Sequence, residues 1–174
     1  LELEVKKNPS NDEAWYLLGA LKADQSDYDG MNVAFTEALK LSGKHAVDVQ
    51  QVRYNNWGKH LNQGVNFLER ASSDSMEYYD RAIAEFNTAS RAWPDTSLTY
   101  RYLGYAYNNK GDLDGALGAY EKAWAVGKDS EALLRAGRIY LERGNRLKTA
   151  FRNENAEGLK IQQKLADVKK NTKK

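Results

Sequence analysis

The sequence offers few side chains that could carry out chemistry. Its only two histidines are His45 and His60, and neither belongs to an H-E-x-x-H or similar spacing, so a local two-histidine metal site has no support. Cysteine is absent, which removes thiolate nucleophiles, thiolate metal ligands and disulfides. There is no G-x-S-x-G sequence and no phosphate loop, and the carboxylates lie among lysines and arginines at the spacing of exposed helix faces. We therefore expect no catalytic residues, no metal site, no cofactor and no enzymatic activity.

The composition is typical of a soluble, globular, helical protein. The chain has 174 residues, 29% of them charged, and a net charge of +2, so the chain as a whole does not point to nucleic acid. No apolar run approaches the roughly 20 residues that a membrane span needs. The localisation stays unknown, because the cytoplasm and a bacterial periplasm both fit this sequence.

Large and small residues recur at helical spacing between Ser97 and Lys128. Large residues stand at i, i+3 and i+7 with a glycine beside the second, and small, large and small residues then follow at i, i+4 and i+7: Tyr100, Leu103, Gly104 and Tyr107, then Ala116, Tyr120 and Ala123. Gly111 and Asp112 separate the two groups as a turn. This pattern predicts an antiparallel helical hairpin whose small residues let the two backbones approach closely.

The hairpin resembles the tetratricopeptide repeat, whose pattern is W-x2-L-G-x2-Y, then A-x3-F, then a closing proline, over about 34 residues. Tyr100 stands in place of the tryptophan, Tyr120 in place of the phenylalanine, and Lys128 where proline is frequent. The resemblance implies an all-α, right-handed α-solenoid of helix-turn-helix repeats. It also implies a scaffold for protein–protein interaction, without indicating the partner.

The same register divides residues 1–174 into repeats of a single domain. Residues 12–45 form repeat 1, 46–96 repeat 2, 97–129 repeat 3 and 130–174 a degenerate repeat 4 or capping helix. Residues 1–9, which end at Pro9, fit the tail of a preceding repeat. Because that register extends upstream of Leu1, we expect the chain to be a fragment of a longer protein.

Repeat 2 is longer than its neighbours. Trp57-Gly58 and Ala82 fill its signature positions, and 24 residues separate Gly58 from Ala82, against 12 between Gly104 and Ala116. The ~12 additional residues keep helical spacing on both sides of a polar break at 71–75. We expect two lengthened helices, at about 46–70 and 75–92, which are either a neutral length variant or an extra docking edge.

The pattern restarts in repeat 4 and then fades. After Leu133, Gly137, Tyr140 and Gly144, the segment RNENAEG interrupts the apolar stripe, and Leu159 and later residues are apolar again. This arrangement fits either a second lengthened hairpin or a repeat helix followed by a capping helix.

The resemblance also implies where a partner lies, because the first helices of stacked repeats line a concave groove. Residues one place after the signature positions point into it: Asn55, Lys59 and Asn62 in repeat 2, Arg101, Tyr105 and Asn108 in repeat 3 with Tyr102 as a further candidate, and Arg135 and Arg138 in repeat 4. Their four cations would form one positive strip. We therefore expect an acidic segment of a protein or peptide as the partner.

Chaperone-binding members of the family hold a C-terminal carboxylate with lysine, asparagine and arginine. The matching positions here are Tyr16, Ala20, Asn56, Leu98 and Tyr102, of which only Asn56 fits. We therefore do not expect this clamp.

Two other functions stay open. The repeats could stack within a larger protein or a homo-oligomer, through exposed apolar ends near Leu1, Leu3 and Val5. The last 16 residues contain six lysines and one aspartate, which could attract nucleic acid. No arginine fork or interleaved aromatic accompanies them, so nucleic acid is the less favoured partner, and we expect no small-molecule substrate.

Overall fold

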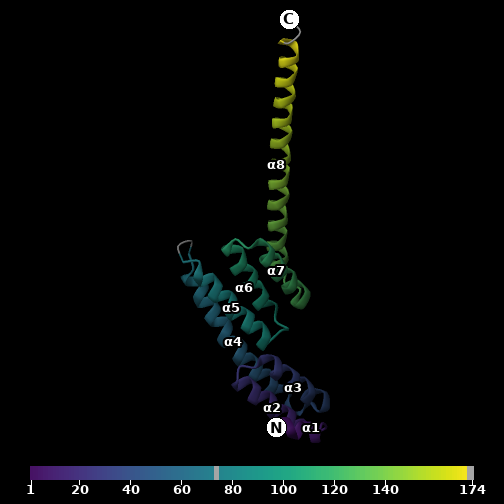
Figure 1. Ribbon diagram of the computed structural model, residues 1–174. Helices are drawn as coiled ribbons and strands as arrows, with labels where there is room; N and C mark the ends of the chain where they lie inside the picture. The colour runs from purple at the N-terminus through teal and green to yellow at the C-terminus, as the bar shows by residue number, and fades with distance from the viewer. Residues whose placement is uncertain (73–74, 172–174) are drawn as a thin grey trace. The chain divides into compact units, whose positions relative to one another are not determined.

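The computed structural model describes residues 1–72 and 75–171, and every regular element in these ranges is helical (Figure 1). The all-α class is therefore confirmed. The helices are α1 (Glu2–Lys7), α2 (Asp12–Asp24), α3 (Tyr28–Leu41), the short 3-10 helix η1 (Gly43–His45), α4 (Ala46–Arg70), α5 (Glu77–Ala92), α6 (Ser97–Lys110), α7 (Leu113–Gly127) and α8 (Ser130–Asn171). The chain forms two compact units, Leu1–Leu133 and Leu134–Lys174. Over the residues described, no helix combines the length and the apolar character needed to cross a membrane.

Aspartate side chains start the second helix of two hairpins. Asp27 accepts a hydrogen bond from the backbone N–H of Gly30 at 3.0 Å, and Asp112 accepts one from Gly115 at 2.9 Å. Each bond satisfies a backbone donor that has no partner within its own helix. Gly111 ends α6 at a φ of 89°, in the left-handed region that glycine adopts without a steric penalty. These residues explain why α2–α3 and α6–α7 turn so tightly.

The two helices of a hairpin meet where a glycine faces an aromatic ring. Gly19 of α2 lies against Phe35 of α3, and Gly104 of α6 lies against Tyr120 of α7. Phe35 and Tyr120 are 0% and 1% exposed. A Cβ atom on either glycine would overlap the ring. Close approach of the backbones therefore requires a glycine at both positions.

In the second hairpin the glycine at this seam is Gly64, so the expectation that Gly58 lies there is wrong. Gly64 faces the fully buried ring of Phe86 on α5, whereas a Cβ on Gly58 would meet no described neighbour within 4 Å. Gly58 lies away from the seam because the side chain of its neighbour, Trp57, points towards α6. Its indole N–H reaches α6 and donates a hydrogen bond of 2.7 Å to the Thr99 hydroxyl, which is completely buried.

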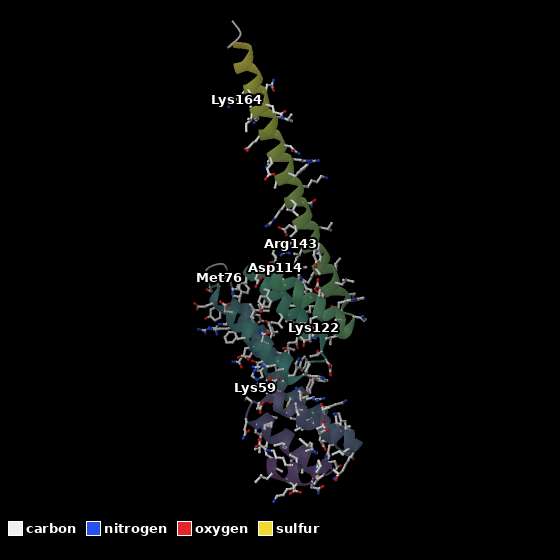
Figure 2. The ribbon with its side chains drawn as sticks, turned by 45° about the vertical axis from the view of Figure 1, so that its right-hand side comes forward. Lys59, Met76, Asp114, Lys122, Arg143 and Lys164 are labelled. Atoms are coloured by element: carbon white, nitrogen blue, oxygen red, sulfur yellow. The ribbon has the colours of Figure 1, made fainter. Side chains whose placement is uncertain are left out.

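This register changes where the additional residues lie. Eighteen residues separate Gly64 from Ala82, against 12 between Gly104 and Ala116, so about half of the extra length lies beyond the seam and half before it. Helices α4 and α5 pack against each other along their length, and Met76 lies beside the tip of their hairpin (Figures 1 and 2). Their bounds are close to the expected 46–70 and 75–92.

Val5, expected at an exposed apolar end, is instead buried. It is 5% exposed and packs with Ala14, Leu18 and Ala34, because α1 lies against the first hairpin. Leu1 and Leu3 are exposed as expected.

Residues 130–171 form one helix, so both two-helix alternatives for this segment are wrong. The segment RNENAEG interrupts the apolar stripe, but it contains no proline, and its arginine, glutamates and alanine favour a helix. A single glycine inside a helix, here Gly158, costs only about 1 kcal/mol relative to alanine. A polar interruption of the stripe is therefore not an interruption of the backbone.

Candidate protein-binding surface

One side of α4 carries amide and cationic side chains that are exposed to solvent. A shallow depression on this side is lined by Lys59, Asn62, Gln63, Asn66, Phe67 and Arg70, and none of the described residues that line it is acidic. Figure 2 labels Lys59. Two predicted site residues, Lys59 and Asn62, are thus brought together. The third on this helix, Asn55, is also exposed, and it accepts a hydrogen bond of 2.7 Å from Gln51 one turn earlier.

Two arginines lie over aromatic rings near the tip of the same hairpin. The Arg70 guanidinium is 4.9 Å from the ring centroid of Tyr78 and donates a hydrogen bond of 3.1 Å to its hydroxyl. The Arg81 guanidinium is 5.4 Å from the Tyr78 ring and 5.9 Å from that of Phe67. Such contacts hold a planar guanidinium in place while its N–H donors stay available to carboxylates. The sequence analysis did not single out these arginines, although both stand one turn from an aromatic residue.

Arg101, which was expected to contribute to the positive strip, is paired within the chain. Its guanidinium contacts Glu131 and lies 3.5 Å from the Asp129 carboxylate. Both acidic residues lie at the start of α8 or just before it. The charge of Arg101 is thus largely balanced, and its contribution to the field around α6 is small.

The other predicted residues of α6 differ in exposure. Tyr102 is partly buried and stacks on Phe86, with ring centroids 5.5 Å apart, so it belongs to the packing between hairpins. Tyr105 and Asn108 are exposed. The spacing predicted that these two residues are exposed, whereas Tyr102, which it placed in the groove, packs against the core instead.

Arg135 and Arg138 lie on α8 in the second unit. Arg138 borders a hollow that is lined by Leu141, Glu142, Asn145, Arg146 and Thr149. Within this hollow Arg146 is 2.5 Å from Glu142. This part of α8 therefore carries both signs of charge.

A polar network that the sequence analysis missed joins three helices of the first unit. Tyr28, at the start of α3, lies 2.8 Å from His60 Nε2 on α4, and His60 Nδ1 lies 2.7 Å from a Glu85 carboxylate oxygen on α5. Asn56 accepts a bond of 3.4 Å from the same tyrosine hydroxyl and donates one to the Val52 carbonyl. His60 and Asn56 thus have structural partners. The available signal was the rarity of histidine, one of only two in the chain.

The other histidine, His45, lies at the junction between α3 and α4. The His45 ring is 5% exposed and stacks on Tyr16 with centroids 4.2 Å apart, and its Nε2 lies 3.1 Å from a Glu13 carboxylate oxygen. A hydrogen bond from the Lys44 ammonium lowers the pKa of Glu13. Among the residues described, no three histidine, cysteine, aspartate or glutamate side chains are grouped as metal ligands would be.

Residues 76–130 match the family model of the tetratricopeptide repeat. This range includes α5, α6 and α7, and with them the glycine seam at Gly104 and Tyr120. This part of the chain is therefore similar to tetratricopeptide repeats, and its all-helical fold agrees with the helical solenoid that such repeats imply.

A curated relative is Peroxisome biogenesis protein 5 of Arabidopsis thaliana, which is 28% identical over 137 residues. The match covers 70% of this chain but only 18% of that protein. Together with the match to the repeat model, this similarity supports a role in protein–protein interaction.

Proposed function

We propose that the chain binds an acidic segment of another protein in a groove lined by α4 and α6. The observation that carries this proposal is the depression on α4, whose described lining contains Lys59, Arg70 and three amides but no carboxylate. Arginine and lysine recognise carboxylates, and amide side chains bond to an extended peptide backbone. Tyr105 and Asn108, exposed on α6, extend the proposed contact.

The charges of the first unit favour α4 as the centre of this site. Arg101 is balanced by Asp129 and Glu131, so a ligand carboxylate would compete with groups already in place. Lys59, by contrast, is exposed and has no salt bridge to a described residue. Cations near the edge of an interface mainly speed association and make it depend on salt.

The proposal is tested with labelled Asp/Glu-rich peptides and with matched peptides in which Asn and Gln replace the acids. Fluorescence anisotropy measures binding to the wild type and to a Lys59→Glu/Arg70→Glu variant. We expect binding of the acidic set to weaken about tenfold or more, which corresponds to roughly 1.4 kcal/mol, and its salt dependence to decrease. The neutral peptides should change little.

The matched control is Lys6→Glu/Lys7→Glu on α1, which changes the net charge by the same amount at exposed positions. Because Arg70 also contacts Tyr78, Lys59→Glu alone serves as a second variant that leaves the tip intact. Equal binding by the wild type and both α4 variants would overturn the proposal. An Arg135→Glu/Arg138→Glu variant in the same titration tests whether the predicted Arg135 and Arg138 contribute.

A further inference from the structure

Helix α8 carries a regular apolar stripe that is exposed along its length. Large apolar side chains on this stripe are more than half exposed: Tyr140 53%, Leu147 72%, Phe151 65%, Ile161 59% and Leu165 55%. Figure 2 shows side chains projecting along this helix, with Lys164 labelled. Five exposed large residues on one helix face are unusual in a protein that acts alone.

The spacing of this stripe is that of a coiled coil. With Gly144, Glu154 and Gly158 included, its positions are 140, 144, 147, 151, 154, 158, 161 and 165, which alternate steps of four and three residues. A repeat of seven residues keeps such a seam facing a partner helix as the two helices wind around each other. We call these eight positions the α8 seam.

We propose that the α8 seam pairs in an antiparallel coiled coil with the α8 seam of a second copy of this chain. In this pairing Leu147 of each copy faces Phe151 of the other, so seam positions 140–158 face one another, while Ile161 and Leu165 lie beyond this overlap. This proposal concerns self-association and does not depend on the acidic ligand proposed for α4.

Side-chain charge argues against a parallel arrangement. In a parallel, in-register pair, Glu154 would face Glu154 of the second copy inside the seam. Arg143 would flank the seam beside Lys148 of the second copy, which adds repulsion between cations. In the antiparallel pair, Arg143 instead lies beside Glu157 of the second copy, and this attraction occurs twice. One like-charge contact remains, between the two Lys148 side chains at the symmetry axis, where long exposed side chains can separate.

Side-chain size argues in the same direction. A parallel pair would place Gly144 and Gly158 opposite their own copies and leave gaps in the seam. The antiparallel pair sets Gly158 opposite Tyr140 and Gly144 opposite Glu154, so each glycine makes room for a larger group. Neither glycine has a described neighbour within 4 Å of the place where a Cβ would be. Glycine weakens an isolated helix. Close approach of a second helix would explain why glycine stands at these two positions.

The first test is sedimentation equilibrium from low to high micromolar concentration. We expect the wild type to form a dimer as its concentration rises and Leu147→Glu/Phe151→Glu to remain monomeric. The matched control is Leu1→Glu/Leu3→Glu, which places the same charges on the other exposed apolar end of the chain. That control should still dimerise. A monomeric wild type, or dimerisation that is lost only in the control, overturns the proposal.

The second test measures orientation, and the absence of cysteine makes it simple. Single variants Lys148→Cys and Lys160→Cys are spin-labelled, and the distance between the two labels of a dimer is measured by pulsed electron resonance. At 1.5 Å rise per residue, the antiparallel pair separates the two copies of position 160 by about 33 Å along the axis and those of position 148 by about 3 Å. A long distance at 160 with a short one at 148 supports the proposal, and similar distances at both positions overturn it.

Discussion

The hairpins α4–α5 and α6–α7 share one internal contact and differ in almost everything around it. Both place a glycine of the first helix against a buried aromatic ring of the second, Gly64 on Phe86 and Gly104 on Tyr120. In α6–α7 the turn follows soon after this contact, with Gly111 in the left-handed region and Asp112 as the cap. In α4–α5 the first helix also ends six residues beyond its glycine, but the connection that follows is longer, residues 71–76 against 111–112, and no described side chain caps α5.

This comparison distinguishes the contact that both hairpins share from the features that vary between them. The glycine–ring contact sets the distance between the two helices, and both hairpins keep it. The length of the connection is free to vary, because its residues need only join two helices that already pack. In the longer hairpin, Phe67, Arg70, Tyr78 and Arg81 contact one another beside this connection.

The largest expected effect comes from removing the ring. Phe86→Ala and Tyr120→Ala should each destabilise the protein by about 3–5 kcal/mol, because both rings are fully buried and their loss leaves a cavity. Urea unfolding followed by circular dichroism measures the change. If one variant lost less than about 1 kcal/mol, the two contacts would not be equivalent.

Filling the glycine should have a smaller effect in the same direction. Gly64→Leu and Gly104→Leu should each cost roughly 1–3 kcal/mol by overpacking against the ring. Gly58→Leu is the matched control on the same helix as Gly64, and it should leave the melting temperature nearly unchanged, since no described group lies near it. If Gly58→Leu destabilised the protein and Gly64→Leu did not, Gly58 would lie at the seam, as the sequence predicted.

Removing the cap tests the difference between the two hairpins. Asp112→Ala should cost about 0.5–2 kcal/mol, since Asp112 satisfies the Gly115 N–H at the start of α7. Ser75→Ala, just before α5, should change stability by less than about 0.5 kcal/mol, as expected for a residue outside such features. Thermal unfolding of both variants gives the comparison, and equal losses would mean that α5 is capped as α7 is.

The smallest effect concerns Asp27, which caps α3 as Asp112 caps α7. The Gly30 N–H, with help from the Lys22 ammonium, lowers the pKa of Asp27. Its contribution to folding is therefore present above the unfolded pKa, near 3.9, and is lost as the pH falls through the lower folded value. Asp27→Asn keeps a capping oxygen but does not titrate. The difference in urea midpoint between wild type and variant should shrink from pH 6 to pH 3, and a constant difference would contradict the assignment.

Much of the fold could be predicted because periodicity reports the buried face of a helix directly. The seams at Gly19 and Gly104 follow from spacing alone. Gly58 and Gly64 could not be distinguished in this way, since both stand on α4 near Leu61, and only the position of the Phe86 ring selects one. Periodicity also cannot show that a polar segment such as 152–158 stays helical.

The candidate site was less predictable, because it depends on partners distant in the sequence. Spacing identified Lys59, Tyr105 and Asn108 as exposed. It could not show that Arg101 meets Asp129 and Glu131, which come from the following helix boundary. Nor could it show that Tyr102 stacks on Phe86, since a stacked tyrosine and a solvent-facing one occupy the same helical spacing.

The hydrogen bonds that join Tyr28, His60 and Glu85 have a mechanical consequence for the first unit. Apolar contacts are non-directional, whereas hydrogen bonds lose strength steeply when their angle changes. In this chain of bonds, the tyrosine hydroxyl donates to a neutral imidazole, or accepts from a protonated one and donates to Asn56 instead. Because either protonation state finds partners, the first two hairpins should resist twisting about each other and bear a pulling force as a single body.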